Sequence, residues 1–459
     1  MNQLYHFIGI GGIGMSGLAR ILLQKGEQVS GSDRVCSLIT QELELAGAQI
    51  FSSHSSSHVS GVSKVVYTTD IKAENLELLE AKRLGLPLMH RSELLAYLMG
   101  DTQPLLVTGT HGKTTTSSLL SYVLEYLGWD PTFAVGGVLK NFGVNSKSGQ
   151  GAFFVAEADE SDGTFLAYPS AKGAIITNIG LDHLNYWHTE QALVDGFCNF
   201  SEKVTDKRHF FWCKDDDRLA KLDLIGLSYG FDSSADVCVG NFIQQGFICS
   251  FSVTIDDIIY KDIQVPLLGR HNALNAAAVF ALVLSLGASE LALRKAFISF
   301  QGVCRRADCI GNEGGVSIYD DYGHHPTEVA VTLKAFRLAF THSRLVVVFQ
   351  PHRYSRTRDC IDGFAEAFSD ADVVILTDLY GAGEVPIPGI NTETLYQKVL
   401  SARHKDIYHL RKDVLVEFLA GFVREGDVVI TMGAGDITKD GPILLQRLQQ
   451  SDSDYAQER

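Results

Sequence analysis

The stretch Leu105-Leu106-Val107-Thr108-Gly109-Thr110-His111-Gly112-Lys113-Thr114-Thr115-Thr116 decides the fold of this chain. A β-branched apolar segment runs directly into Gly-Lys-Thr and a helix-forming tail, which predicts a strand, a glycine loop and a helix in that order. Loops of this kind bind nucleotide phosphates, because backbone N–H groups and the helix N-terminus point at the anion. Lys113 adds a positive charge and Thr114 a hydroxyl for Mg2+, so the stretch predicts an ATP or GTP site.

The loop departs from the common motif at one position. That motif has a glycine at the place of Val107, whereas the nearest glycine here is Gly109, so we expect a shorter loop. A chance occurrence of Gly-Lys-Thr after a strand is the alternative. It is disfavoured because strand, loop and helix follow one another in the order that phosphate binding requires.

Composition excludes several classes of protein. At roughly 150 residues per domain, the 459 residues predict about three domains. With 46% hydrophobic and 20% charged residues, and no apolar run of the roughly 18 residues that span a bilayer, we expect a soluble protein without membrane segments. The eight cysteines form no Cys-x-x-Cys pair and no secretory signal is read, which predicts reduced thiols in the cytoplasm. A net charge of -15 argues against nucleic acid as a partner, while monomer and dimer both stay open.

The first predicted domain, residues 1–102, opens with a second glycine-rich turn. Phe7-Ile8-Gly9-Ile10 predicts a strand, the run Gly9–Gly17 a turn, and Leu18–Leu23 a helix. Asp33 ends a further strand about 20 residues beyond, where an acid commonly binds ribose hydroxyls. Taken alone, this pattern suggests NAD and an oxidoreductase, which would leave Gly112-Lys113-Thr114 unexplained.

The second predicted domain, residues 103–301, carries polar clusters after two of its strands. The strands at residues 152–156 and 173–177 lead into Glu157–Asp162 and Asn178–His183. Ligands of open α/β sheets bind at the carboxyl ends of the strands, so we expect both clusters near the phosphate loop. The metal of a bound nucleotide needs further oxygen or imidazole ligands, and Glu157 and His183 are the candidates.

The third predicted domain, residues 302–459, is another α/β unit with two dense polar clusters. Tyr319–Pro326 and Gln350–Arg358 each follow a strand-like run, and the second holds three arginines and a histidine. Arginine binds carboxylate or phosphate bidentately, which favours an anionic substrate over a solvated basic turn. The residues alone therefore indicate an ATP-dependent ligase or kinase.

Two smaller predictions concern the same domain. Asp320 is predicted only to form a turn, and the polar residues 451–459 are predicted to be a disordered tail or a linker.

A series of motifs makes the chain resemble the Mur ligases along essentially its whole length. The motifs are Gly9–Ser16, Gly109–Thr115, Glu157–Asp162, Leu268–Asn275, Gly302–Arg306, Asp320–Pro326, Gln350–Arg356 and Tyr380–Gly389. Their joint occurrence in this order is highly specific. The shortened phosphate loop is then expected, since this family uses Gly-Thr-His-Gly-Lys-Thr.

The resemblance implies an α/β fold of three domains. These would be an N-terminal Rossmann-like domain that binds UDP, not NAD, a central P-loop ATPase-like domain, and a C-terminal Rossmann-like domain that binds the amino acid. The resemblance further implies an ATP-dependent ligase that joins L-alanine to the carboxylate of UDP-N-acetylmuramate through an acyl phosphate, giving ADP and phosphate, in peptidoglycan precursor synthesis. A recycling ligase that attaches a whole tripeptide is the alternative within the family, but the motifs around Tyr322–Pro326 and His352–Arg356 favour a free small amino acid.

The resemblance also implies roles for individual residues. Lys113, Glu157 and His183 would be catalytic, and Thr114, Glu157 and His183 would hold Mg2+ or Mn2+. The ATP-binding residues would be Gly109, Thr110, His111, Gly112, Lys113, Thr114, Thr115, Arg306 and Asp321, with Asn272 and Asn275 at the adenine. The UDP-N-acetylmuramate site would comprise Gly11, Gly12, Ile13, Gly14, Asp33 and Ser161. The L-alanine site would comprise Tyr322, His324, His352, Arg353 and Arg356.

Overall fold

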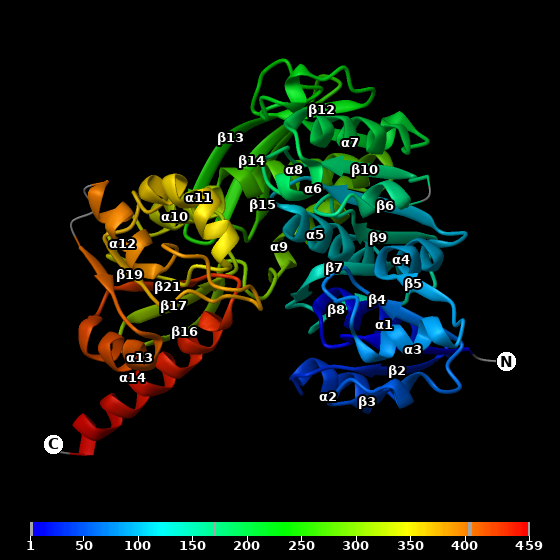
Figure 1. Cartoon of the computed structure of the whole chain (residues 1–459). Helices are drawn as coiled ribbons and strands as arrows, with labels where there is room; N and C mark the ends of the chain where they lie inside the picture. The colour runs from blue at the N-terminus through cyan, green and yellow to red at the C-terminus, as the bar shows by residue number, and fades with distance from the viewer. Residues whose placement is uncertain (1–2, 169, 403–405, 458–459) are drawn as a thin grey trace. The chain divides into compact units, whose positions relative to one another are not determined.

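The computed structural model of the protein describes residues 3–168, 170–402 and 406–457. Its strands form three sheets, each covered by helices (Figure 1). The chain divides into two compact units, one of Met1–Gly240, Ser252–Ile263 and Leu274–Gln301, the other of Asn241–Phe251, Gln264–Ala273 and Gly302–Arg459. The α/β class predicted from the sequence is confirmed.

The N-terminal sheet is parallel throughout, with the strand order β3-β2-β1-β4-β5. Its strands are β1 (Leu4–Ile8), β2 (Gln28–Ser32), β3 (Gln49–Phe51), β4 (Lys64–Tyr67) and β5 (Leu88–His90). Its helices are α1 (Ile13–Gln24), α2 (Leu38–Leu45), η1 (Ser56–Val59), α3 (Leu76–Arg83) and α4 (Arg91–Met99). Phe7, Ile8, Val65 and Val66 are all buried, as expected of central strands that are covered on both faces.

The middle sheet has ten strands, in the order β15-β14-β13-β12-β11-β10-β6-β9-β7-β8. The strands are β6 (Gln103–Thr108), β7 (Thr132–Leu139), β8 (Val144–Lys147), β9 (Phe153–Glu157), β10 (Gly173–Ile176), β11 (Phe210–Cys213), β12 (Leu227–Gly230), β13 (Val237–Gln245), β14 (Ile248–Ile255) and β15 (Ile258–Val265). The helices are α5 (Lys113–Tyr126), η2 (Thr164–Ala167), α6 (Leu184–Trp187), α7 (Glu190–Glu202), η3 (Lys207–His209), η4 (Leu219–Lys221), α8 (Arg270–Ser285) and α9 (Glu290–Ser299).

Strand β6 carries the phosphate loop and lies between β9 and β10, parallel to both. Val107 pairs with Glu157 of β9, and Thr108 pairs with Ile176 of β10. The three strands therefore end at the same edge of the sheet. This register brings the phosphate loop and the two polar clusters together, as the sequence predicted.

The C-terminal sheet has the order β16-β17-β21-β18-β19-β20, with β16 antiparallel to β17 and the other pairs parallel. The strands are β16 (Asp308–Glu313), β17 (Val316–Asp321), β18 (Leu345–Phe349), β19 (Val373–Leu376), β20 (Ile407–His409) and β21 (Val428–Met432). The helices are α10 (Pro326–Ala339), α11 (Tyr354–Ala367), α12 (Thr392–Ser401), α13 (Lys412–Phe422), η5 (Asp436–Lys439) and α14 (Asp440–Gln457).

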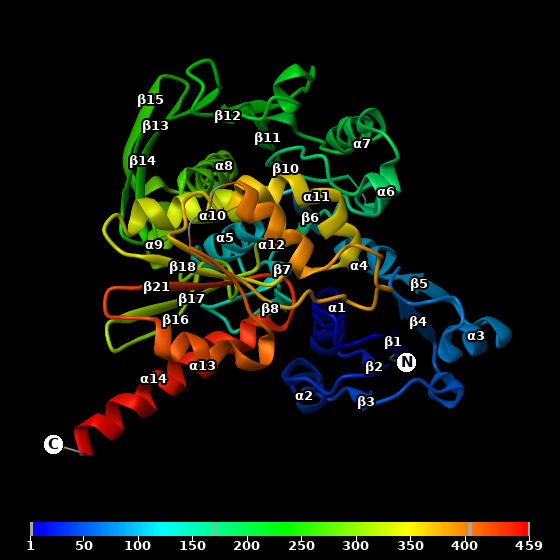
Figure 2. The ribbon, with the colours of Figure 1, turned by 60° about the vertical axis from the view of Figure 1, so that its left-hand side comes forward.

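Alternate residues of the C-terminal strands face two separate cores. Val347 and Phe349 of β18 pack with residues of α10, α11 and α12, whereas Val346 and Val348 pack with residues of α13 and α14. Figure 2 shows these helices on opposite faces of the sheet. Both faces of the sheet are thus buried, which accounts for the unbroken apolar run of Leu345–Phe349.

Two predictions for the third domain are wrong. Asp320 lies inside β17, where its buried carboxylate accepts hydrogen bonds from the hydroxyls of Thr431 (2.8 Å) and Thr438 (2.6 Å), so it does more than form a turn. Helix α14 continues to Gln457, so the polar residues 451–457 are helical and not disordered; residues 458 and 459 lie outside the described part. In the described residues, no helix combines the length and apolarity that crossing a bilayer requires.

Gly31 of β2 allows the first glycine turn to pack closely. A Cβ at this position would lie 2.6 Å from Ile10 Cδ1 and 2.9 Å from the Phe7 carbonyl oxygen, and Ile10 is fully buried. We therefore expect Gly31→Ala to destabilise the N-terminal domain by about 1–3 kcal/mol, the range typical of overpacking. Thermal unfolding followed by circular dichroism measures the effect.

Gly421→Ala is the matched control, because a Cβ on Gly421 of α13 would meet no atom within 4 Å. Alanine is the better helix former, so this variant should melt at the wild-type temperature or slightly above it. A Gly31→Ala protein that melts no lower than the control would contradict the packing argument.

Candidate functional site

The phosphate loop is held against the end of β10. Gly109 has φ +131° and approaches so closely that a Cβ there would lie 2.1 Å from Thr177 Oγ1. The Thr177 hydroxyl donates to the carbonyl of His111 (2.6 Å), and the His111 amide donates to Asn178 Oδ1 (2.9 Å). Gly112 is left-handed (φ +84°) and directly precedes α5. The loop backbone is thus fixed ahead of a helix N-terminus, the geometry that binds phosphate.

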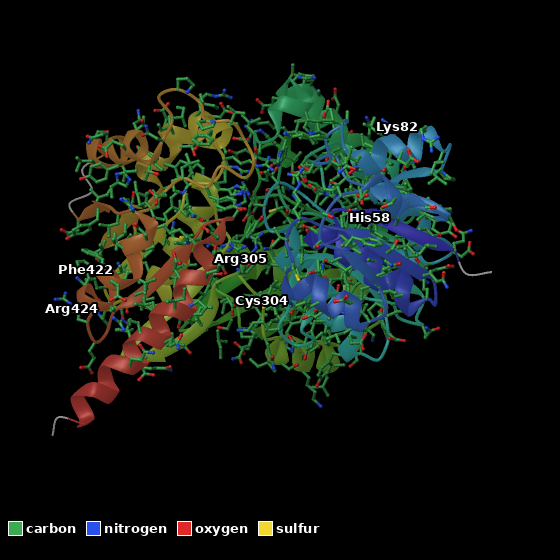
Figure 3. The ribbon with its side chains drawn as sticks, turned by 60° about the horizontal axis from the view of Figure 1, so that its bottom comes forward. His58, Lys82, Cys304, Arg305, Phe422 and Arg424 are labelled. Atoms are coloured by element: carbon green, nitrogen blue, oxygen red, sulfur yellow. The ribbon has the colours of Figure 1, made fainter. Side chains whose placement is uncertain are left out.

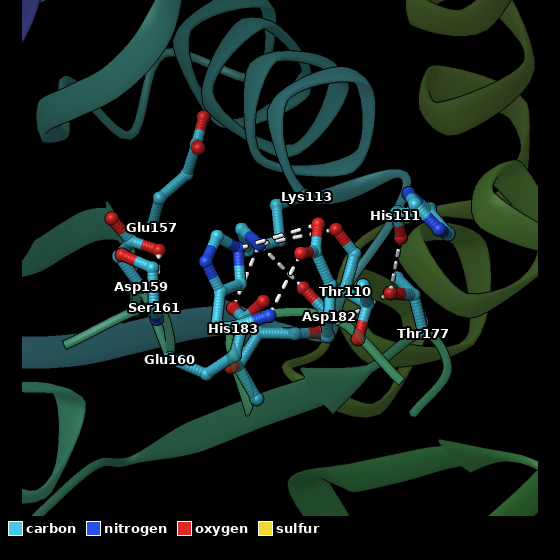
Figure 4. A network of polar contacts seen from close by, with 12 residues as sticks. Thr110, His111, Lys113, Glu157, Asp159, Glu160, Ser161, Thr177, Asp182 and His183 are labelled. Carbon is cyan, nitrogen blue, oxygen red and sulfur yellow. Dashed lines mark hydrogen bonds and ion pairs between the residues drawn. The ribbon is translucent and has the colours of Figure 1, made fainter. Parts of the chain in front are cut away.

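All three hydrogens of the Lys113 ammonium are directed at protein oxygens. Nζ donates to Glu160 Oε2 (2.7 Å), the Gly109 carbonyl (2.6 Å) and the Thr110 carbonyl (3.3 Å), as the dashed lines of Figure 4 show in part. Burial alone would lower the pKa of Lys113, but the nearby carboxylates, Glu160 foremost, raise it above its ordinary value. The lysine is therefore a fixed positive charge inside the loop.

Thr114 and Glu157 lie side by side next to the loop. Glu157 Oε2 accepts from the Thr114 hydroxyl (3.2 Å), while Oε1 accepts from the Ser117 hydroxyl (3.0 Å) and the Gly136 amide (2.5 Å). A hydroxyl and an oriented carboxylate are the hard oxygen donors that Mg2+ prefers, so this pair fits a magnesium ion.

His183 occupies the loop after β10 in a left-handed conformation, with φ +59°. Its amide donates to Asp182 Oδ1 (2.7 Å), and its ring lies 3.6 Å from Asp182 Oδ2. Within the described ranges, no hydrogen bond joins His183 to Thr114 or Glu157, and no three His, Cys, Asp or Glu side chains form a cluster suited to a metal ion. The structure thus pairs two of the three predicted metal ligands, and the role of His183 stays a prediction.

Arg91 connects the N-terminal glycine turn with the acidic run after β9. Its guanidinium lies 3.2 Å from Asp159 Oδ2 and 3.7 Å from Asp162 Oδ2. A Cβ on Gly14 would lie 3.7 Å from Arg91 Nη1, and the Ser161 amide donates to Asp159 Oδ1 (3.2 Å). Gly14 and Ser161 are both predicted to bind the UDP-sugar. Gly14 lies next to Arg91 and Ser161 next to Asp159, so the Arg91–Asp159 ion pair links them.

The first glycine turn is held by Asp33. Its Oδ2 accepts from the Gly11 amide (2.9 Å) and its Oδ1 from the Val35 amide (3.1 Å). Gly12 directly precedes α1, and the carbonyl of Ile13 accepts from Asn145 Nδ2 of β8 (2.8 Å). Asp33 thus orients the turn, and contact with a ribose stays a prediction.

The two asparagines at the start of α8 have different surroundings. A Cβ on Gly112 would lie 3.1 Å from Asn275 Nδ2, so Asn275 lies against the phosphate loop. Asn272 Nδ2 donates to the carbonyl of Leu268 (2.8 Å), just before the helix. The loop contact of Asn275 is compatible with nucleotide binding, whereas contact of either residue with adenine stays a prediction.

Two arginines of the C-terminal unit lie near the ring of Tyr322. The guanidinium carbons of Arg305 and Arg306 lie 4.8 and 5.1 Å from its ring centroid. Arg305, labelled in Figure 3, also donates to the carbonyls of Gly433 (2.6 Å) and Gly435 (3.3 Å). These contacts fix the aromatic ring and join the turn after β21 to the segment that precedes β16.

The carboxylate of Asp321 is hydrogen-bonded to the backbone around it. Its carboxylate accepts from the amides of Ala307 (2.8 Å) and Gly323 (2.7 Å), and its burial raises its pKa to about 6. The role predicted for Asp321 at ATP is neither supported nor contradicted by these contacts.

Four of the five residues predicted to bind the amino acid lie together in this unit. The ring centroids of Tyr322 and His324 are 5.2 Å apart, and those of His324 and His352 are 6.0 Å apart. Arg356 Nη1 lies 3.1 Å from His352 Nδ1, and the ring of Tyr380 stacks on His352 at 5.7 Å. The predicted site is therefore one continuous group of rings and guanidinium groups.

Arg353, the fifth residue, directly precedes α11 with φ +66°, and its amide donates to the carbonyl of Tyr380 (2.8 Å). It therefore stands at a helix N-terminus, where backbone amides favour an anion. Burial lowers the pKa of His324 to about 4. Burial and the nearby Arg356 lower the pKa of His352 to about 3. Both imidazoles are therefore neutral near pH 7.

Comparison with known proteins accounts for all three sheets. Residues 4–103 match the Mur ligase family catalytic domain, residues 107–283 the Mur ligase middle domain, and residues 305–435 the Mur ligase glutamate ligase domain. The chain belongs to the Mur ligase family.

Individual Mur ligases resemble the chain over most of its length. The UDP-N-acetylmuramate–L-alanine ligase of Protochlamydia amoebophila is 46% identical over 98% of this chain and 99% of its own. The crystal structure of the UDP-N-acetylmuramate–alanine ligase from Thermotoga maritima matches with a TM-score of 0.85 and 28% identity, over 98% of this chain and 100% of that one. A UDP-N-acetylmuramate:L-alanyl-γ-D-glutamyl-meso-diaminopimelate ligase from Neisseria meningitides has a TM-score of 0.59 and 28% identity, over 66% of this chain and 100% of its own.

Several residues in the site of this Mur ligase were not predicted from its sequence. Glu160, the partner of Lys113, is 1% exposed, but its place in a run of acids does not distinguish it from its neighbours. Arg91 lies in no recognised motif and meets Asp159 only through tertiary contact. Tyr380, whose ring stacks on His352, belongs to the motif Tyr380–Gly389. Its position in that motif could have indicated a role in the site.

The buried histidines predict how the stability of this Mur ligase depends on pH. The pKa values of His271 and His324 are lowered from 6.5 to about 4, so the unfolded chain binds more protons than the folded one between these values. Stability from this source is fully present above about pH 6.5 and is lost as the pH falls toward 4, by up to about 1.4 kcal/mol per pH unit for each histidine.

Guanidinium denaturation of the wild type and of His324→Gln, at pH values from 7 to about 4.5, tests this expectation. The variant lacks one titrating group, so its stability should fall less steeply. Equal slopes for the two proteins would show that His324 is not a buried neutral imidazole.

Proposed function

We propose that the protein is an ATP-dependent ligase that joins L-alanine to the carboxylate of UDP-N-acetylmuramate, giving ADP and phosphate, in peptidoglycan precursor synthesis. The observation that carries the proposal is the phosphate loop with Lys113 and the Thr114–Glu157 pair, in a chain 46% identical over nearly its whole length to an L-alanine ligase of this kind. Phosphate release, followed with UDP-N-acetylmuramate, ATP and a panel of amino acids plus the tripeptide, tests it.

The first step is attack of the muramyl carboxylate on the γ-phosphorus of ATP. The bond to the oxygen of ADP breaks as the new bond forms, which gives an acyl phosphate. Negative charge spreads over the phosphoryl oxygens. Lys113 and the amides at the start of α5 are positioned to stabilise that charge, since they are fixed before the nucleotide binds.

Thr114 and Glu157 supply the oxygen ligands for Mg2+ or Mn2+, with His183 as a further candidate. A bound divalent ion would neutralise phosphate charge and align the γ-phosphate. The hydrogen bonds from Ser117 and Gly136 hold the Glu157 carboxylate in one orientation for this purpose.

The UDP-sugar is assigned to the N-terminal glycine turn. Gly11, Gly12, Ile13 and Gly14 present the turn and the start of α1 to a pyrophosphate, and Ser161 is close to the same turn through Arg91 and Asp159. Asp33 holds the turn in shape. A UDP-sugar bound between this turn and Ser161 would have its muramyl carboxylate near the phosphate loop.

The second step is attack of the alanine amine on the carbonyl carbon of the acyl phosphate, with phosphate as the leaving group. The residues proposed to bind the amino acid are Tyr322, His324, His352, Arg353 and Arg356. Their grouping in one unit supports this assignment.

The residues proposed to bind ATP are Gly109, Thr110, His111, Gly112 and Thr115 of the phosphate loop, together with Asn272, Asn275, Arg306 and Asp321.

The two alternatives raised by the sequence are not favoured. A nicotinamide site would use the first glycine turn, but that turn lies in a Mur ligase domain. The L-alanine ligase of Protochlamydia amoebophila is 46% identical to the chain, whereas the tripeptide ligase of Neisseria meningitides is 28% identical over 66% of it, which disfavours tripeptide recycling. We also propose domain limits of 1–102, 103–301 and 302–459, because β1–β5, β6–β15 and β16–β21 each form one sheet. A cytoplasmic location fits eight free cysteines and the use of ATP.

Lys113→Ala should reduce the rate of ligation to about 1% or less of the wild-type rate while the protein remains folded. The variant loses the fixed charge beside the phosphates, and the loss of a preorganised charge typically costs about 10²–10³ in kcat. Lys82→Ala is the control, since Lys82 projects from α3 at the surface (Figure 3). Near-normal phosphate release by Lys113→Ala would remove the phosphate-binding role.

Glu157→Gln should raise the Mg2+ concentration needed for half-maximal phosphate release at least about tenfold, because an amide is a weaker ligand than a carboxylate. Asp206→Asn, at a carboxylate bound to Arg208 away from the loop, serves as the control. An unchanged Mg2+ requirement in Glu157→Gln would exclude it as a metal ligand.

A further inference from the structure

The backbone of His183 is bound to the short helix that follows it. His183 directly precedes α6, and its carbonyl accepts hydrogen bonds from the amides of Tyr186 (2.9 Å) and Trp187 (3.1 Å). A displacement of Trp187 would therefore displace His183 as well. The earlier part of the same loop is fixed separately, because the amide of Gly180 donates to the hydroxyl of Thr110 (2.8 Å) in the phosphate loop.

The side chain of Trp187 is bound to the other polar loop of the site. Its indole Nε1–H donates to the carbonyl of Glu160 (3.0 Å), in the loop that follows β9. The same carbonyl accepts from the amide of Gly163 (3.1 Å), and the carboxylate of Glu160 accepts from Lys113 (2.7 Å, Figure 4). Trp187 thus joins the loop after β10 to the loop after β9.

Two glycines make room for the aromatic rings of α6. A Cβ on Gly196 of α7 would lie 2.5 Å from Trp187 Cη2 and 2.8 Å from Cζ3, and a Cβ on Gly163 would overlap the ring of Tyr186. Gly196 is buried in the middle of α7, where alanine would make a more stable helix. The ring of Trp187 accounts for the glycine, because it occupies the space that a side chain would need.

Phe165 of η2 forms the second contact of the Trp187 ring. The two ring centroids are 6.1 Å apart and the planes meet at 90°, an edge-to-face contact. Phe165 is itself fully buried and stacks on Phe200 of α7, with centroids 5.4 Å apart. The seat of Trp187, which we define as Gly196 and Phe165, therefore belongs to two elements that are packed against each other.

We propose that Trp187 is a positioning residue for the divalent cation of the proposed reaction. The seat fixes the indole, and the indole fixes the backbone of His183. The imidazole of His183 is thereby held where it can join the Thr114–Glu157 pair at a cation. The inference rests on the proposed function, because it concerns the metal of that reaction. It adds a residue that supplies no ligand atom and belongs to none of the recognised motifs.

A double-mutant cycle between Trp187 and its seat tests the first part of this path. In Gly196→Ala the new methyl group takes the space of the Trp187 ring, while every proposed ligand is retained. We expect the dissociation constant of Mn2+, titrated against the protein saturated with ADP, to rise about tenfold. Trp187→Phe should cause a similar loss, because phenylalanine lacks the N–H group and is too short to reach residue 196. In the Trp187→Phe protein, Gly196→Ala should then cause no further loss.

A second cycle tests whether Trp187 acts through His183. His183→Ala should weaken Mn2+ binding at least as much as Trp187→Phe, and Trp187→Phe should add nothing in the His183→Ala protein. Gly421→Ala is the control for the glycine, since a Cβ there would meet no atom within 4 Å. Trp129→Phe is the control for the tryptophan, because Trp129 stacks on Phe153 at the opposite end of β9 from Glu157. Neither control should change the dissociation constant of Mn2+.

Thermal unfolding, measured on the same variants, separates positioning from a structural role. A merely structural Trp187 would lower the melting temperature and leave the Mn2+ constant of the folded protein unchanged, and this result would overturn the proposal. Additive losses in either cycle would overturn it too. The KM of L-alanine should change less than about twofold, because the amino acid is assigned to the C-terminal unit.

Failure of the proposed function would look different. A wild-type protein that binds Mn2+ with ADP, but releases no phosphate with UDP-N-acetylmuramate, ATP and L-alanine, would refute the proposed reaction. The two Mn2+ cycles would still decide the role of Trp187, since they require no turnover.

Discussion

The parallel pairing of β6 with β9 and β10 is the constraint on which the rest of the catalytic arrangement depends. It ends three strands at one edge of the sheet, so that the loop after β6, Glu157 at the end of β9 and Thr177 after β10 meet without any long connection. The close approach of Gly109 to Thr177 is possible only because residue 109 has no side chain. Shifting β9 or β10 by one residue would turn Glu157 or Thr177, respectively, to the other face of the sheet.

The sequence predicted the parts of this arrangement that are encoded locally. A strand, a glycine loop and a helix each have a short-range signature, and the polar residues at two strand ends follow from the general behaviour of α/β sheets. Contacts between segments far apart in the chain had no such signature. Arg91 and Asp159, or Lys113 and Glu160, meet because of tertiary packing, and no spacing in the sequence indicates which acid of Glu157–Asp162 faces which base.

The failed predictions have physical causes as well. Asp320 resembled a turn residue because acids are frequent in turns, but two hydroxyl donors allow its carboxylate to be buried inside β17. The polar end of the chain extends α14, and composition alone could not distinguish a polar helix from a disordered tail. His183 has the expected position after β10, yet its contacts with Asp182 leave its relation to the Thr114–Glu157 pair to experiment.

The three hydrogen bonds of Lys113 have a consequence for the thermodynamics of nucleotide binding. Fixing a lysine side chain costs up to about 2 kcal/mol of rotamer entropy, and in this protein that cost is met during folding, through Glu160 and two loop carbonyls. If ATP binds at this loop as proposed, its phosphate would exchange with a partner that already holds Lys113 and would order little that was free. The cost of ordering Lys113 would then fall on folding, and the association of ATP proposed for this loop would carry a smaller entropic penalty.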